Sequence, residues 1–158
     1  MTGTNPVEQL AIAKAMREWL WLYPSVEIVH IVGFTILVGS VAMFDLRVLG
    51  LSKRIPVSAI ARHLLPWSAG ALVLIVPSGL LMFSAHAGDF LTNTAFQLKM
   101  ALLVAAGLNA AFFHTGPYQS VKTWNVDAPA PMLAKVSVIL SLVIWLAIIS
   151  CGRLLAYL

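Results

Sequence analysis

Residues 23–44 read YPSVEIVHIVGFTILVGSVAMF, and from Ile28 to Phe44 this stretch contains no Asp, Glu, Lys or Arg. Three further stretches share this property: residues 64–85, 101–117 and 136–152. A helix needs about 17–25 apolar residues to cross the hydrocarbon of a bilayer, so each stretch is long enough. The sequence therefore predicts four membrane-spanning helices, over about residues 24–46, 60–86, 95–115 and 132–156.

The composition supports this interpretation. Hydrophobic residues make up 60% of the chain and charged residues 10%, whereas about a quarter of the residues in a soluble domain are charged. We expect an all-α integral membrane protein, a four-helix bundle in a single domain over residues 1–158. Pro66 and Pro77 should kink the second span rather than end it. The ten Lys and Arg residues lie at the ends of the apolar stretches, which indicates membrane boundaries rather than a nucleic-acid partner.

The first twenty residues have a different pattern. Apolar residues recur there every three or four positions with charged residues between them, which is typical of an amphipathic helix on a membrane surface. We expect this interfacial helix over residues 5–21 and expect it to be retained rather than cleaved. Trp19, Trp21 and Tyr23 then form an aromatic belt before the first span.

Four spans place both termini on one side of the membrane, here called side A. The loops at residues 45–63 and 115–135 then lie on the opposite side, here called side B. The first side B loop alone contains four basic residues: Arg47, Lys53, Arg54 and Arg62. Because basic loops stay in the cytoplasm, the sequence predicts a bacterial inner-membrane protein with both termini in the periplasm.

All four histidines belong to a predicted span or its edge. His30 and His86 lie near side A, and His63 and His114 lie near side B. A histidine within a membrane is costly without a partner and is therefore a candidate functional residue. The two histidines of each pair belong to different helices and lie at the same depth in the membrane. This arrangement predicts two sites, each of which binds a ligand between two helices.

Two histidines per site favour haem over zinc. Zinc usually takes four protein ligands, and no cysteine or second carboxylate lies beside either pair to complete such a set. A haem iron needs only two axial ligands, and small residues would let a flat ring approach the backbone. Gly33 lies three residues after His30, and Gly79 lies seven residues before His86.

Cationic side chains near the surface suit haem propionates. Arg47 and Arg62 are placed for this on side B, and Lys99 or Arg153 on side A. Alternatively, each of these side chains packs its aliphatic part against the apolar region and places its charged end at the membrane–water interface. Asp45 is predicted to form an ion pair with Arg47 or Arg62, and Asn109 to hydrogen-bond across helices.

The stretches YPSVEIVHIVGFTILVGSVAMFDLRVLG and FQLKMALLVAAGLNAAFFH resemble a family of small four-span bacterial inner-membrane proteins with no assigned function. The layout is also similar to four-helix b-type cytochromes that hold two haems. This resemblance implies that His30, His86, His63 and His114 are axial ligands of two haem b groups, or that one pair is vacant. It implies an electron carrier across the membrane, with a quinone, a quinol or a redox protein as donor or acceptor. Whether the chain forms a homo-oligomer is left open.

Two alternatives remain at this point. The first is a copper-handling membrane protein, because Met82 lies four residues before His86, and Met43 and Met100 lie in or near spans. Thioether and imidazole ligands together suit Cu(I). The second alternative is a structural subunit of a membrane complex.

Overall fold

The structure is a computed structural model that describes residues 5–155, so residues 1–4 of the predicted domain and residue 156 of the last predicted span lie outside it. The described residues are helical and contain no strand, which confirms the all-α fold class. The elements in chain order are η1 (Pro6–Gln9), α1 (Ala11–Glu18), α2 (Leu22–Leu49), α3 (Val57–Ala85), α4 (Ala87–Thr92), α5 (Thr94–Thr115), η2 (Pro117–Thr123) and α6 (Met132–Leu154).

Four of these helices, α2, α3, α5 and α6, are long and apolar enough to cross a membrane. They match the four predicted spans to within a few residues and confirm a multi-pass helical membrane protein. The 28 residues of α2 are about 42 Å long, so this helix exceeds the hydrocarbon thickness of about 30 Å. It ends at Gly50, whose φ of 116° is a left-handed conformation that closes the helix. The helix α3 continues through both Pro66 and Pro77, as predicted.

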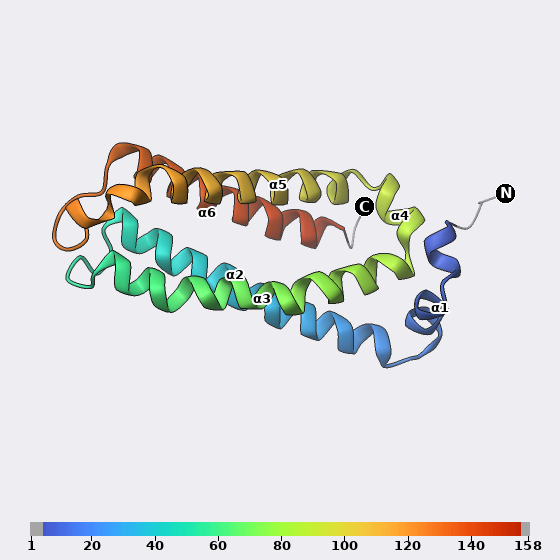
Figure 1. Ribbon diagram of the computed structural model, residues 1–158. Coiled ribbons are helices and arrows are strands. Elements are labelled where there is room, and N and C mark those ends of the chain that lie inside the picture. Colours follow the sequence, from blue (N-terminus) through green and yellow to red (C-terminus); the bar gives the residue numbers. More distant parts are fainter. Residues whose placement is uncertain (1–4, 156–158) are drawn as a thin grey trace.

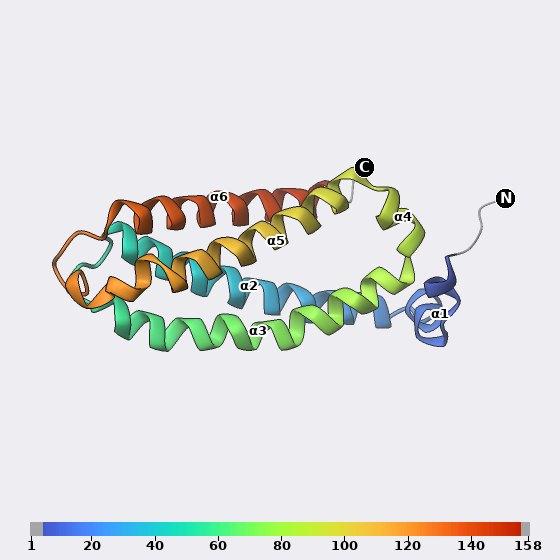
Figure 2. The same ribbon diagram turned by 45° about the horizontal axis from the view of Figure 1, so that its top comes forward.

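The bundle consists of two helix pairs, α2 with α3 and α5 with α6 (Figures 1 and 2). The loop between α2 and α3 and the segment containing η2 lie together at one end, which is side B. The helices α1 and α4 lie at the other end, together with the C-terminal end of α6. Figure 1 also shows that the two pairs converge at side B and diverge toward α4.

The main apolar core closes the bundle at side B. It joins residues of α2, α3, α5, α6 and the η2 segment: Phe44, Val48, Val57, Ala61, Phe113, Trp124, Ala130, Ala134 and Val138. The rings of Phe44 and Phe113 meet edge to face with centroids 5.6 Å apart. This core fixes the two helix pairs against each other at side B.

The helices α2 and α3 approach closely near their middle. A Cβ atom at Gly33 of α2 would lie 2.9 Å from Ile75 Cγ1 and 3.0 Å from Leu74 Cβ, both on α3. Glycine is therefore needed at this crossing, as at other close helix contacts in membranes.

The predicted interfacial helix is divided into two shorter elements, η1 and α1, with Leu10 between them in an extended conformation (φ −59°, ψ 144°). Both elements dock on side A of the bundle. Glu8 Oε1 accepts a hydrogen bond of 2.7 Å from the Gly88 backbone N–H, and Arg17 Nη1 donates one of 2.9 Å to the Ala85 carbonyl. The apolar side chains of Ala13 and Met16 are buried in this contact. Side-chain hydrogen bonds therefore hold the amphipathic segment on the α3–α4 corner.

Candidate functional site

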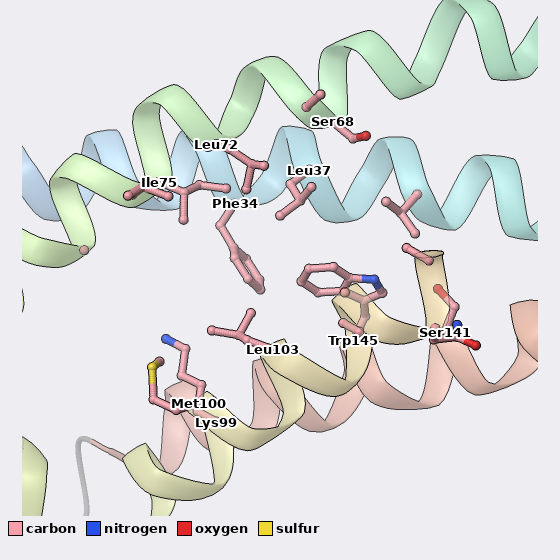
Figure 3. Close-up of a pocket in the computed structure, with 18 of the residues that line it drawn as sticks. Phe34, Leu37, Ser68, Leu72, Ile75, Lys99, Met100, Leu103, Ser141 and Trp145 are labelled. Atoms are coloured by element: carbon pink, nitrogen blue, oxygen red, sulfur yellow. The ribbon is translucent and has the colours of Figure 1, made fainter. Parts of the chain in front are cut away.

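A cavity of about 1010 Å³ lies between the two helix pairs (Figure 3). Residues of α2, α3, α4, α5 and α6 line it, and most of them are aliphatic or aromatic. Its volume is at the upper end of the range of about 300–1,000 Å³ for small-molecule and cofactor sites. The cavity can therefore hold a large organic group.

The side A half of this cavity has aromatic walls. Phe83, Phe90 and Phe96 stack with interplanar angles of 17° to 19° and centroid distances of 5.3 to 6.3 Å. Phe34 of α2 and Trp145 of α6 both line the cavity and meet edge to face, with ring centroids 6.0 Å apart (Figure 3). Flat aromatic walls favour a flat ligand.

His30 lines the same half, and α3 fixes the orientation of its ring. Nδ1 lies 3.2 Å from the Ile75 carbonyl oxygen and 3.0 Å from Ser78 Oγ. The Ser78 hydroxyl donates its own proton to the Leu74 carbonyl, so it accepts from His30. A carbonyl can only accept, so the contact with Ile75 favours the tautomer with the proton on Nδ1, and in that tautomer the lone pair of Nε2 is left for a ligand. Metal-ligating histidines are commonly oriented by such a bond from their other ring nitrogen.

Gly79 provides the space for this ring. A Cβ atom there would lie 3.2 Å from His30 Cε1, which is closer than an ordinary carbon contact. The sequence spacing predicted Gly79 to lie beside His86, whereas the structure places it against His30.

One cation and two thioethers line the same half as His30. Lys99 and Met100 project into the cavity from α5, across from α2 (Figure 3). Met82 lines it from α3. Among the predicted propionate partners, all of which the structure describes, Lys99 is therefore the one that lines the cavity.

Polar side chains gather toward side B. Asn109 Nδ2 donates to the Ser137 carbonyl at 3.0 Å, and Ser137 Oγ donates to Asn109 Oδ1 at 2.9 Å. This exchange joins α5 to α6 and confirms the predicted cross-helix role of Asn109. Asp45 and Ser141 line the cavity beside it.

The remaining three histidines occupy different environments. His86 is exposed at the α3–α4 junction, where its ring meets Tyr23 at 5.9 Å and Phe90 at 6.4 Å. His63 is exposed on α3 and is not part of the cavity wall. His114 lines the side B end, and its Nδ1 lies 2.8 Å from the Ala110 carbonyl oxygen.

The structure does not bring either predicted histidine pair to a common site. The ring of His30 packs at Gly79, seven residues before His86, which places the two histidines about 10 Å apart along the helix axis. On side B, His114 lines the cavity whereas His63 lies outside its wall. The two histidines that do line the cavity, His30 and His114, lie near its opposite ends.

The two predicted arginines of side B also lie outside the cavity. Arg47 is 3% exposed, and its guanidinium donates to the carbonyls of Ile55 at 2.6 Å, Lys53 at 2.9 Å and Asn125 at 3.1 Å. These bonds hold the side B loops together, so the predicted ion pair with Asp45 is not formed. Arg62 is exposed on α3.

Sequence reasoning missed the polar partners of the site, Ser78 and Ser141. A signal was present for one of them, because Ser137 and Ser141 are four residues apart and therefore share a face of α6. Within residues 5–155, no three His, Cys, Asp or Glu side chains form a group that could hold a metal ion.

The fold defines a multi-pass helical membrane protein with a cavity of about 1010 Å³ between its helix pairs. Residues 22–158 match the family described as "Family of unknown function (DUF6644)", and the chain belongs to this family. The match begins at α2 and includes all four long helices. Comparisons with curated proteins and with solved structures gave no match.

Proposed function

We propose that this protein is a b-type cytochrome that binds one haem in the side A half of the cavity, with His30 as an axial ligand. The observation that carries the proposal is the geometry of His30. Its Nδ1 is bound to α3, and its Nε2 is left for a ligand in a cavity large enough for a macrocycle. The four-histidine arrangement with two haems has less support, because neither histidine pair shares a wall of the cavity.

The other residues of this half suit a haem. The aromatic walls accept a flat ring, and the Lys99 ammonium can neutralise a propionate. Met100, which lines the same half of the cavity from α5, is the second side chain that could hold the haem iron. Histidine with methionine is an established axial pair and raises the reduction potential of a haem.

The chain's own residues would orient the ligand and exclude water. A bound haem supplies one-electron chemistry, while Ile75 and Ser78 keep the His30 ring in place. The apolar walls would exclude water and provide a low local dielectric around a bound haem.

The proposed setting is the bacterial inner membrane, with both termini in the periplasm and the basic side B loops in the cytoplasm. The lipid bilayer surrounds the apolar helices. A quinol, a quinone or a redox protein would act as electron donor or acceptor, and association of several copies is compatible with the exposed apolar surface of the spans.

A pigment assay tests the proposal. Protein purified in detergent from haem-replete bacteria should be red, with a Soret band and about one non-covalent haem b per chain in a pyridine haemochrome assay. His30→Ala should lose the haem, whereas the matched change His63→Ala, at an exposed position of α3, should retain it. A colourless wild-type preparation, or haem loss from His63→Ala but not from His30→Ala, would reject the assignment.

Copper is a second candidate, because His30, Met82 and Met100 line the same half of the cavity. Imidazole with two thioethers suits Cu(I). The volume favours haem, since one copper ion would leave most of the cavity empty. Elemental analysis of the same preparations separates the two: about one copper per chain, lost in Met100→Leu and without a Soret band, would favour copper.

A further inference from the structure

Asp45 is the one described residue with a buried side-chain oxygen or nitrogen that makes no hydrogen bond. It is 4% exposed and lines the cavity from the side B half of α2, and its Oδ2 atom has no hydrogen-bond partner among residues 5–155. A buried polar atom without a partner is costly, and acidic side chains within spans commonly mark functional sites. Because Asp45 also lines the cavity, a bound water or a ligand group that reaches the carboxyl could supply the missing partner.

The neighbouring polar groups do not supply that partner. Asn109 and Ser137 hydrogen-bond to each other, and the guanidinium of Arg47 donates to three loop carbonyls. The Ser141 hydroxyl of α6 hydrogen-bonds to the Asp45 carboxyl, and Oδ2 of that carboxyl still has no partner. Asp45 of α2 and Ser141 of α6 therefore form a small polar site in a cavity whose walls are mostly apolar.

Aromatic side chains border this polar site. Trp145 lies four residues after Ser141, on the same face of α6, and both project into the cavity in Figure 3. An aromatic ring that packs on Trp145 can place a hydroxyl group near Asp45, where the carboxyl oxygen accepts its proton in a hydrogen bond. The aliphatic walls, including Leu37 and Leu72, suit an apolar tail (Figure 3).

We propose that Asp45 and Ser141 form the head-group site for a quinol-class ligand, an aromatic ring with hydroxyl donors and an apolar tail. This proposal names the class of electron donor for the proposed cytochrome and the site where the donor binds. A redox role for the bound quinol rests on the proposed function. The binding itself needs no haem. A quinol and a hydroxylated lipid both carry a hydroxyl donor on an apolar tail. Only the quinol also has an aromatic ring that can pack on Trp145.

The test measures binding of decylubiquinol under anaerobic conditions to the full-length protein in lipid nanodiscs, with monoolein as the non-aromatic hydroxylated probe. Asp45→Leu removes the acceptor and keeps the branched shape of the side chain, although the two methyl groups occupy more volume than the two oxygen atoms. Replacing a buried unpaired acid by an apolar residue commonly leaves a protein as stable or more stable, so this variant should fold. Loss of a hydrogen bond to a carboxylate should weaken decylubiquinol binding by about tenfold or more.

Ser68→Ala is the matched control. Ser68 also lines the cavity, but its hydroxyl donates to the Leu65 carbonyl of its own helix at 2.9 Å, so this change should leave the affinity unaltered. Equal binding of decylubiquinol to wild type and Asp45→Leu, or no binding to either, would overturn the proposal. Monoolein binding as tight as that of decylubiquinol and equally weakened by Asp45→Leu would overturn the quinol assignment in favour of a lipid.

Haem content is measured on the same preparations, which separates this inference from the cytochrome proposal. If the protein is colourless but its quinol binding depends on Asp45, the head-group proposal is retained and the cytochrome proposal is rejected. If the protein is red but its quinol binding does not depend on Asp45, the cytochrome proposal is retained and the head-group proposal is rejected.

Discussion

Replacing Gly33 by alanine tests the contact that positions His30. The added Cβ atom would lie 3.0 Å from Leu74 Cβ and 3.3 Å from the Ala71 carbonyl oxygen. Carbon atoms in ordinary contact are about 3.5–4.0 Å apart, so α2 and α3 must separate by about 0.5 Å. Because Leu74 Cβ and the Ala71 carbonyl are fixed to the α3 backbone, a side-chain rotation cannot relieve both contacts. Overpacking of this kind costs about 1–3 kcal/mol.

Gly39→Ala is the matched control on the same helix. Gly39 is exposed, and a Cβ atom added there would have no atom within 4 Å. Both substitutions gain up to about 1 kcal/mol of helix propensity, so that gain cancels when the two variants are compared. We therefore expect Gly33→Ala to have a free energy of unfolding about 1–3 kcal/mol below that of Gly39→Ala.

The assay is unfolding by sodium dodecyl sulfate in mixed micelles, followed by circular dichroism. His30 lies three residues before Gly33, so separation of the helices should also weaken its bonds to Ser78 and Ile75. In a haem-loaded preparation, Gly33→Ala should accordingly lower the haem content as well. If Gly33→Ala unfolds at the same or a higher detergent fraction than Gly39→Ala, the helices do not approach as closely as described.

Two further predictions concern side B. Arg47→Met should lower the free energy of unfolding by about 2–4 kcal/mol, because three loop carbonyls lose a charged donor whose side chain is buried, whereas exposed Arg62→Met should change it by less than about 0.5 kcal/mol. Equal effects in the same detergent titration would contradict the role of Arg47 in holding the loops. Alkaline phosphatase fused to the C-terminus should be active, and the same enzyme inserted in the loop at residues 50–56 should be inactive, since it functions only in the periplasm. The opposite pattern would reverse the proposed orientation.

The four spans could be predicted from the sequence because the requirement for a span is local. A segment in lipid must satisfy its backbone hydrogen bonds internally and present apolar side chains to the bilayer, and a single run such as Ile28 to Phe44 shows both. The cross-helix bond of Asn109 could be predicted for a related reason, since an amide at mid-span needs a partner. The role of buried Arg47 in joining the side B loops could not be predicted from the sequence, because its acceptors are carbonyls of loops far apart in the chain.

The sequence by itself also singled out His30 as a residue that needs a partner, but only the tertiary structure decided which residues surround it. Depth along a span follows from position in the chain, whereas the direction of a side chain depends on how each helix is rotated. In a helix that is apolar on all sides, the sequence contains no stripe that fixes this rotation. Close packing fixes it instead: Gly33 and Gly79 let α2 and α3 meet so that His30 binds Ser78, while His63 and His86 of the same α3 region are left outside the cavity.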